Sequence, residues 1–192
     1  MLAYLTYDLS TLFLLMVLLV AVVTDLRRNR IPNWLTFGTL VCGLLLQYTF
    51  LGSDGLIAGL AGAGMGLVLL IPFFLLGGMG AGDVKMMAAV GTLLGFKPVM
   101  MAAALSLCLA GLYALLLITL KGEWSSLLQR YFVSLRTSTY VAPAAGSVAR
   151  QRFPFALAIA GGTLSVLAMQ SQLDFYHLAN ELTYQWQLWG EG

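Results

Sequence analysis

Two aspartates, Asp25 and Asp83, stand at the ends of long apolar stretches in a chain with few other charges. A carboxyl group at the edge of a membrane segment is costly to place there and marks a candidate functional site. Two carboxyl groups in one site can activate water against a peptide bond, because the ionised group accepts a proton from water while the protonated group donates one to the carbonyl oxygen. Held close together, they cannot both ionise cheaply and would share a proton. We therefore predict a catalytic dyad, provided that the fold brings the two residues together.

Each aspartate also has a purely structural interpretation. Asp25 could simply end the first apolar helix, next to the basic residues Arg27 and Arg28. Asp83 could be the N-cap of the helix that follows it, since aspartate is among the preferred N-cap residues. Neither interpretation can be dismissed from a single residue, so the neighbouring sequence has to decide.

Four glycines precede Asp83 within the segment Gly77–Gly82. A helix cap needs none of them, whereas a site that accepts an extended peptide needs bare backbone beside its carboxyl group. This pattern favours the functional interpretation. We predict that Gly78, Gly80 and Gly82 contact the substrate.

The composition as a whole is that of a polytopic membrane protein. The 192 residues are 60% hydrophobic and only 9% charged, with a mean hydropathy of +0.89. One membrane helix takes roughly 20 apolar residues, so spans use up most of the chain. We predict an all-α integral membrane protein in which residues 1–192 form a single domain with about six transmembrane helices. The expected spans are Tyr4–Thr24, Trp34–Leu51, Leu56–Leu76, Val84–Phe96, Pro98–Leu120 and Phe153–Met169. Since no cleavable signal is recognised at the N-terminus, the first span is expected to be retained.

The basic residues predict the orientation of these spans. With the Asp25–Asn33 loop in the cytoplasm, only Lys97 would lie on the opposite side of the membrane, as the positive-inside rule requires. Both termini are then extracytoplasmic, and Asp25 and Asp83 share the cytoplasmic face. The other nine basic residues on that face are Arg27, Arg28, Arg30, Lys85, Lys121, Arg130, Arg136, Arg150 and Arg152.

The remaining segments are expected to support this core. Trp124–Leu135 repeats apolar residues at helical spacing, so residues 121–152 are predicted to form a cytoplasmic interfacial helix followed by a loop that covers or gates the site. Residues 170–192 would be an extracytoplasmic tail with aromatic anchors. A stripe of small residues in the third span is interpreted as a surface for close helix packing; it consists of Gly55, Gly59, Gly62 and Gly66.

Few residues are suited to metal or cysteine chemistry. Cys42 and Cys108 form no CxxC pair and are expected to be small buried residues. The only histidine, His177, falls in the predicted outer tail. We therefore expect no metal and no cofactor.

Three sequence blocks resemble a known family. Gly80-Ala81-Gly82-Asp83 looks like the GxGD signature of intramembrane aspartyl proteases, and it occurs together with Asp25-Leu26-Arg27 and Ile31-Pro32-Asn33. The stretch from Arg152 to Gly161 is similar to the R-x-P-[YF]-x-x-A-I-A-x-G block that opens the last helix of the type IV prepilin peptidases. In this order the blocks resemble that family, most closely the compact prepilin peptidases of tight-adherence (Flp) pilus systems.

The resemblance implies Asp25 and Asp83 as catalytic residues of an aspartic endopeptidase in the bacterial inner membrane. Its substrates would be prepilins and pseudopilins, whose cytoplasmic leader peptide is removed, and its partners the lipid bilayer and the pilus assembly machinery, without nucleic acid. The large bifunctional members also carry a cysteine-rich cytoplasmic domain and methylate the new N-terminus. Because that domain has no counterpart in this sequence, N-methyltransferase activity is not expected.

Two other classes of function remain open. A small transporter could use the carboxyl groups as proton or cation sites, although both lie at one membrane face and no inverted repeat is visible. A structural assembly factor could use Asp83 only as a helix cap.

Overall fold

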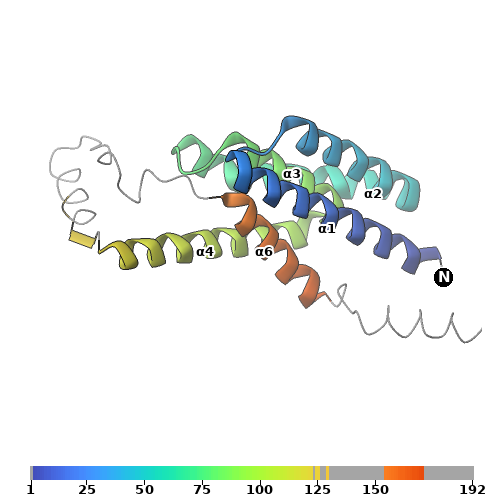
Figure 1. Ribbon diagram of the computed structural model, residues 1–192. Helices are drawn as coiled ribbons and strands as arrows, with labels where there is room; N and C mark the ends of the chain where they lie inside the picture. The colour runs from blue at the N-terminus through green and yellow to red at the C-terminus, as the bar shows by residue number, and fades with distance from the viewer. Residues whose placement is uncertain (1, 123, 126–128, 130–153, 171–192) are drawn as a thin grey trace, which may run out of the picture.

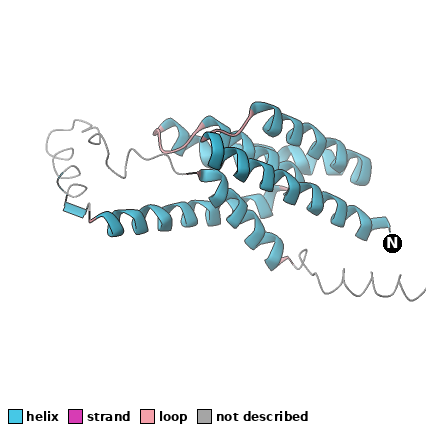
Figure 2. Ribbon diagram, in the orientation of Figure 1, coloured by secondary structure: helices cyan, strands magenta, loops and turns pink. Residues whose placement is uncertain are grey.

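The computed structural model describes residues 2–122, 124–125, 129 and 154–170. They form helices α1 (Leu2–Arg28), α2 (Asn33–Leu75), α3 (Ala81–Leu94), α4 (Phe96–Lys121) and α6 (Phe155–Met169), which pack side by side as a bundle (Figure 1). Helices and short loops account for these residues, with no strand among them (Figure 2). The prediction of an all-α protein is confirmed for this part of the chain.

Helix α2 is a hairpin of two antiparallel arms, because the backbone at Gly52 leaves the helical conformation (φ 63°, ψ −144°). Gly59 lies beside the side chain of Leu44, and Gly55 beside the backbone of Gln47. In one straight helix Leu44 and Gly59 would be about 22 Å apart, at 1.5 Å per residue. Glycine suits the reversal because it reaches positive φ without steric cost. The predicted spans Trp34–Leu51 and Leu56–Leu76 leave residues 52–55 for the connection, and in the structure only Gly52 departs from helical backbone angles.

Three helical segments are long and apolar enough to cross a membrane: Leu9–Arg28, Asn33–Leu75 and Phe96–Lys121. The 14-residue α3 and the 15-residue α6 are shorter, so the predicted number of six spans stays a prediction. Large apolar side chains are exposed on the outside of the bundle, among them Met16, Leu19 and Phe37, each at least 66% accessible. An apolar surface of this extent suits contact with lipid.

The centre of the bundle is α3, whose Met86, Met87 and Val90 are completely buried. The glycine stripe of the second α2 arm packs against it. A Cβ on Gly62 would collide with the carbonyl oxygen of Gly91, and a Cβ on Gly66 would come within 2.6 Å of that of Met87. The close-packing interpretation of the stripe is thus confirmed, and the helix that it holds is the one that carries Asp83.

The ends of α1 and α2 differ from the prediction. Helix α1 continues to Arg28, which places Asp25 inside its last turns rather than at the start of a loop. Asn29 follows in the left-handed conformation (φ 49°) and donates its N–H to the carbonyl of Asp25 at 2.7 Å. Pro32 is the N-cap of α2, and Asn33, which the sequence placed at the end of the loop, is the first residue of the helix. The loop therefore has only four residues, 29–32.

Other predictions are wrong, or they concern residues outside the part of the chain that the structure describes. Cys42 and Cys108 are exposed on the apolar outside of the helices, so their predicted burial is wrong. The Trp124–Leu135 helix lies outside the described residues except for positions 124, 125 and 129. The loop that follows it, most of the 170–192 tail and His177 also lie outside them.

Candidate active site

Asp25 is buried where the end of α1 meets the start of α6. Its side chain is only 6% exposed, and its Oδ2 accepts a hydrogen bond of 3.1 Å from the backbone N–H of Ala156. These two residues are 131 positions apart in the sequence. The contact was not foreseen from the sequence, because a backbone donor carries no residue-type signal.

Asp83 lies in the first turn of α3, three residues after the N-cap Gly80. Its Oδ2 accepts the backbone N–H of Gly80 at 2.9 Å, which satisfies one of the donors that a helix start leaves free. Asp83 is therefore not the N-cap, as the structural interpretation of this residue would have it, although its carboxyl group still stabilises the start of the helix. A single hydrogen bond to Oδ2 leaves the other oxygen for a further role.

The two carboxyl groups lie within electrostatic reach of each other. The pKa of Asp83 is raised to about 6: loss of solvation on burial is the largest cause, the hydrogen bond from the N–H of Gly80 lowers the pKa, and the negative charge of Asp25 raises it. Like charges disfavour each other's ionised form. The fold thus brings together the two aspartates that the sequence singled out, although they are 58 positions apart.

The glycines before Asp83 have mixed roles. Gly77 (φ 75°) ends α2, and the N–H groups of Gly77 and Gly78 bond to the carbonyls of Phe74 and Phe73, both at 2.9 Å. This pair of bonds is a Schellman motif, which favours glycine at Gly77. A Cβ on Gly82 would lie 3.3 Å from that of Ile31, so this glycine admits the α1–α2 loop. Sequence reasoning missed both structural causes, and the predicted substrate contacts of Gly78, Gly80 and Gly82 stay predictions.

Gly78 and Gly80 are exposed in the loop that leads to Asp83. A Cβ on Gly80 would come within 3.3 Å of Oδ2 of Asp83. The absence of a side chain at this position therefore keeps the approach to the carboxyl group open.

Lys85, two residues after Asp83, has a hydrogen-bond partner on another helix. Its Nζ donates a hydrogen bond of 3.1 Å to Oδ1 of Asn33. The contact links the first turns of α3 and α2 on the side of the bundle that carries the aspartates. The sequence analysis used Lys85 only as a marker of the cytoplasmic face, and the structure adds this hydrogen bond.

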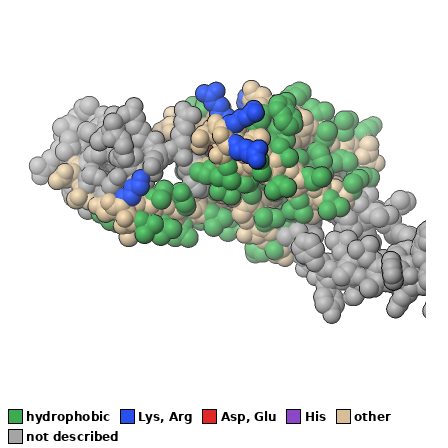
Figure 3. Space-filling model, viewed as in Figure 1, with side chains coloured by type: hydrophobic (Ala, Val, Ile, Leu, Met, Phe, Trp, Pro, Cys, Tyr) green, Lys and Arg blue, Asp and Glu red, His purple; other side chains and the backbone are tan. Residues whose placement is uncertain are grey.

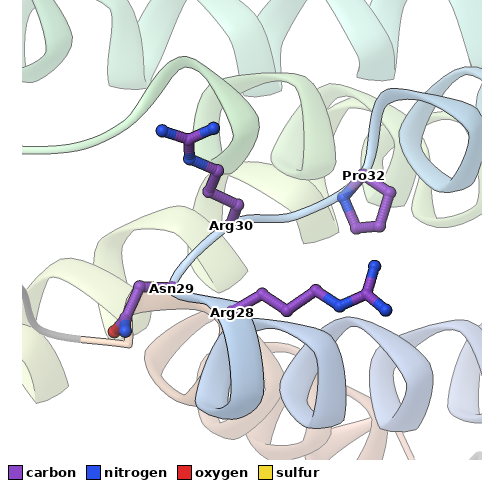
Figure 4. Close-up of a pocket in the computed structure, with 4 residues that line it drawn as sticks. All are labelled: Arg28, Asn29, Arg30 and Pro32. Atoms are coloured by element: carbon purple, nitrogen blue, oxygen red, sulfur yellow. The ribbon is translucent and has the colours of Figure 1, made fainter.

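A shallow cavity of about 590 Å³ lies at the turn between α1 and α2, lined by Arg28, Asn29, Arg30 and Pro32. Arg28 extends toward the side of Pro32, whereas Arg30 and Asn29 point away from it (Figure 4). Figure 3 shows a group of basic side chains near the top of a largely apolar face, with further basic atoms apart from this group at the lower left. Neither aspartate lines this cavity, so it is an electropositive neighbour of the acidic pair.

Metal-ligand clusters do not occur among the residues that the structure describes: nowhere in this set do three or more His, Cys, Asp or Glu side chains gather. The described chemistry of the site is that of two carboxyl groups, backbone N–H donors and nearby cations.

These features define a class: an all-helical, membrane-type bundle with two aspartates at one end, where the charge of one acts on the other. The sequence profile of the type IV leader peptidase family matches residues 12–115. This is more than half of the chain and includes both aspartates, and the chain belongs to that family. The resemblance to the type IV prepilin peptidases is thereby confirmed. Comparisons with curated proteins and with solved structures gave no match.

Proposed function

We propose that this protein is a membrane aspartyl endopeptidase that removes the leader peptide of type IV or Flp-type prepilins and pseudopilins. Asp25 and Asp83 are the catalytic pair, and cleavage takes place at the cytoplasmic face of the bacterial inner membrane. Membership of the leader peptidase family supports the substrate class. The assignment of the pair rests on the burial of Asp25 and on the effect of its charge on Asp83.

One observation carries the proposal: the charge of Asp25 acts on Asp83 and helps to raise its pKa to about 6. A carboxyl group that keeps its proton up to about pH 6 beside a second, ionised carboxyl group is what acid and base catalysis by one pair requires. Two unrelated structural carboxylates, 58 residues apart in the sequence, would have no reason to meet at the same end of a bundle.

The chemistry proceeds in two steps. The ionised carboxyl group accepts a proton from water as the water oxygen attacks the scissile carbonyl carbon, and the protonated group donates its proton to the carbonyl oxygen. The resulting tetrahedral diol then breaks its C–N bond, with a proton passing to the leaving amine. The products are the leader with a new carboxyl end and the pilin with a new amino end. We assign the two aspartates as a coupled pair.

The surroundings of the pair support the orientation and the entry of substrate. Exposed Arg27, Arg28 and Arg30 follow Asp25, and an excess of basic residues marks the cytoplasmic side. Exposed Gly78 and Gly80 form the approach to Asp83 and would accept an extended leader segment, whose backbone can then come close to the carboxyl groups.

The test is cleavage of a co-expressed Flp-type prepilin by the wild type and by Asp25→Asn and Asp83→Asn. Asparagine keeps the shape and the hydrogen-bond acceptor but cannot share a proton, so both variants should lose cleavage at normal membrane abundance. Asp54→Asn is the matched control, since Asp54 is exposed next to the Gly52 reversal, and it should cleave like the wild type. Normal cleavage by either dyad variant would refute the proposal.

A transporter or a structural assembly factor remains the contrasting class. If the protein were a transporter, the asparagine variants would alter ion flux into sealed vesicles and would leave prepilin length unchanged. An assembly factor would need Asp83 only to hold the N–H of Gly80, a role that asparagine also fills. Pilus assembly would then survive Asp83→Asn, whereas a peptidase would fail.

A further inference from the structure

Asp25 is placed where its own helix offers it no hydrogen-bond donor. It lies near the C-terminal end of α1, where the free backbone groups are carbonyl oxygens and the helix dipole is negative. Asp83 is in the opposite situation, in the first turn of α3, where the N–H of Gly80 is three residues away. A buried carboxyl group at the position of Asp25 therefore needs a donor from another element.

Helix α6 supplies that donor. Pro154 is its N-cap, and the N–H groups of a first helical turn have no acceptor within their own helix. The N–H of Ala156 points out of this turn to Oδ2 of Asp25 at 3.1 Å, in a buried position. The positive end of α6 thus meets the negative end of α1 at the carboxyl group.

The start of α6 is packed tightly enough to hold the backbone N–H of Ala156 in place. Ala156 and Ile159 are almost completely buried in the core. One turn further on, Gly162 lies so close to α4 that a Cβ would collide with the side chain of Ser106 and approach the carbonyl of Ala102 within 2.5 Å. The N–H of Ala156 therefore belongs to a helix that α4 and the core hold in place.

We propose that the backbone N–H of Ala156 is a positioning group for catalysis: it holds Oδ2 of Asp25 and so presents the other oxygen, Oδ1, to the water and to Asp83. This inference rests on the proposed function and adds a task for α6, which lies outside the matched family segment 12–115. Ala156 acts through Asp25 and does not itself touch the reacting atoms.

The test replaces single backbone N–H groups by ester oxygens. Ala156→lactic acid removes the donor and keeps the methyl side chain. Leu157→leucic acid is the matched control, because its N–H also makes a 3.1 Å hydrogen bond, in this case to the carbonyl of Pro154. Hydrogen bonds to charged groups are the stronger kind, so the Ala156 ester should lower kcat about 10- to 100-fold with little change in KM. The Leu157 ester should stay within about threefold of the wild type.

A second readout separates positioning from general destabilisation. An N–H donor favours the ionised form of its acceptor, so the acid limb of the pH profile of cleavage should move to higher pH in the Ala156 ester and stay in place in the Leu157 ester. In cells, cleavage by Ala156→Pro can be compared with cleavage by Lys97→Pro. Ala156 and Lys97 are each the second residue of a helix and follow a phenylalanine. Ala156→Gly, which keeps the N–H, should restore cleavage relative to Ala156→Pro.

Equal effects of the two esters, or an unmoved acid limb, would overturn the positioning role while Asp25→Asn and Asp83→Asn remain inactive. Normal cleavage by either asparagine variant would instead overturn the proposed function itself.

Discussion

Gly62 of α2 and Gly91 of α3 meet backbone to backbone: a Cβ built on either glycine would collide with the carbonyl oxygen of the other. This reciprocal contact joins the second arm of the α2 hairpin to the helix that carries Asp83. Small residues let membrane helices approach in this way. The depth of the contact determines how far α3 can sink into the bundle, and thereby where Asp83 lies.

Gly62→Ala should therefore destabilise the protein and reduce its activity. The added methyl group meets backbone atoms, which cannot move aside as a flexible side chain would, so the cost should reach or exceed the ~1–3 kcal/mol typical of overpacked cores. Gly91→Ala should behave alike. Thermal unfolding in detergent, followed together with prepilin cleavage, measures both effects.

Gly64→Ala is the control for this prediction. Gly64 lies on the same arm of α2, but its Cβ would meet no atom within 4 Å. Replacing a helical glycine by alanine in open space should be neutral or stabilising by about 0.5–1 kcal/mol. If Gly62→Ala were as stable as Gly64→Ala, the close contact of α2 and α3 would be wrong.

The carboxyl group of Asp83 should make stability depend on pH. Burial raises the pKa of Asp83 to about 6, above the value near 4 of an unfolded chain. The folded state then holds the proton more tightly, so the free energy of unfolding should fall as pH rises from about 4 to about 6 and stay lower above that. At ~1.4 kcal/mol per pH unit, the loss is about 1–3 kcal/mol.

Asp83→Asn removes this dependence. The variant should unfold at a higher temperature than the wild type at pH 8 and lose that advantage near pH 4, since Asn can still accept the N–H of Gly80. Melting curves at the two pH values, with Asp54→Asn as the control, provide the measurement. The predicted sign would be contradicted if the wild type, compared with Asp83→Asn, were less stable at pH 4.5 than at pH 8.

Much of the site could be predicted from the sequence because its signals are chemical outliers. A carboxyl group at the border of an apolar run is rare enough to attract attention, and both aspartates were found in this way. The Gly52 reversal and the glycine stripe were also visible, since small residues at helical spacing and short polar breaks have direct structural causes.

The rest depended on contacts that residue types do not encode. The donor to Asp25 is a peptide N–H 131 positions away, and any residue except proline could supply it. The register of α3 could not be read either, because Ala81, Gly82 and Asp83 are all compatible with a loop or a first turn. Gly77 was counted among the glycines that favour a functional site, whereas a Schellman motif explains it.

Cleavage itself should decline on the alkaline side. The pair works only while it keeps one proton, and in the free protein Asp83 releases its proton at about pH 6, beside the charge of Asp25. The pH profile of kcat/KM reports the free enzyme, so its alkaline limb should bend at about pH 6 and fall up to tenfold per pH unit above it. Purified protein in vesicles, with a prepilin peptide and buffers of constant ionic strength, gives this profile. A rate that is level between pH 5 and pH 8.5 would show that Asp83 is not the group whose proton the reaction needs.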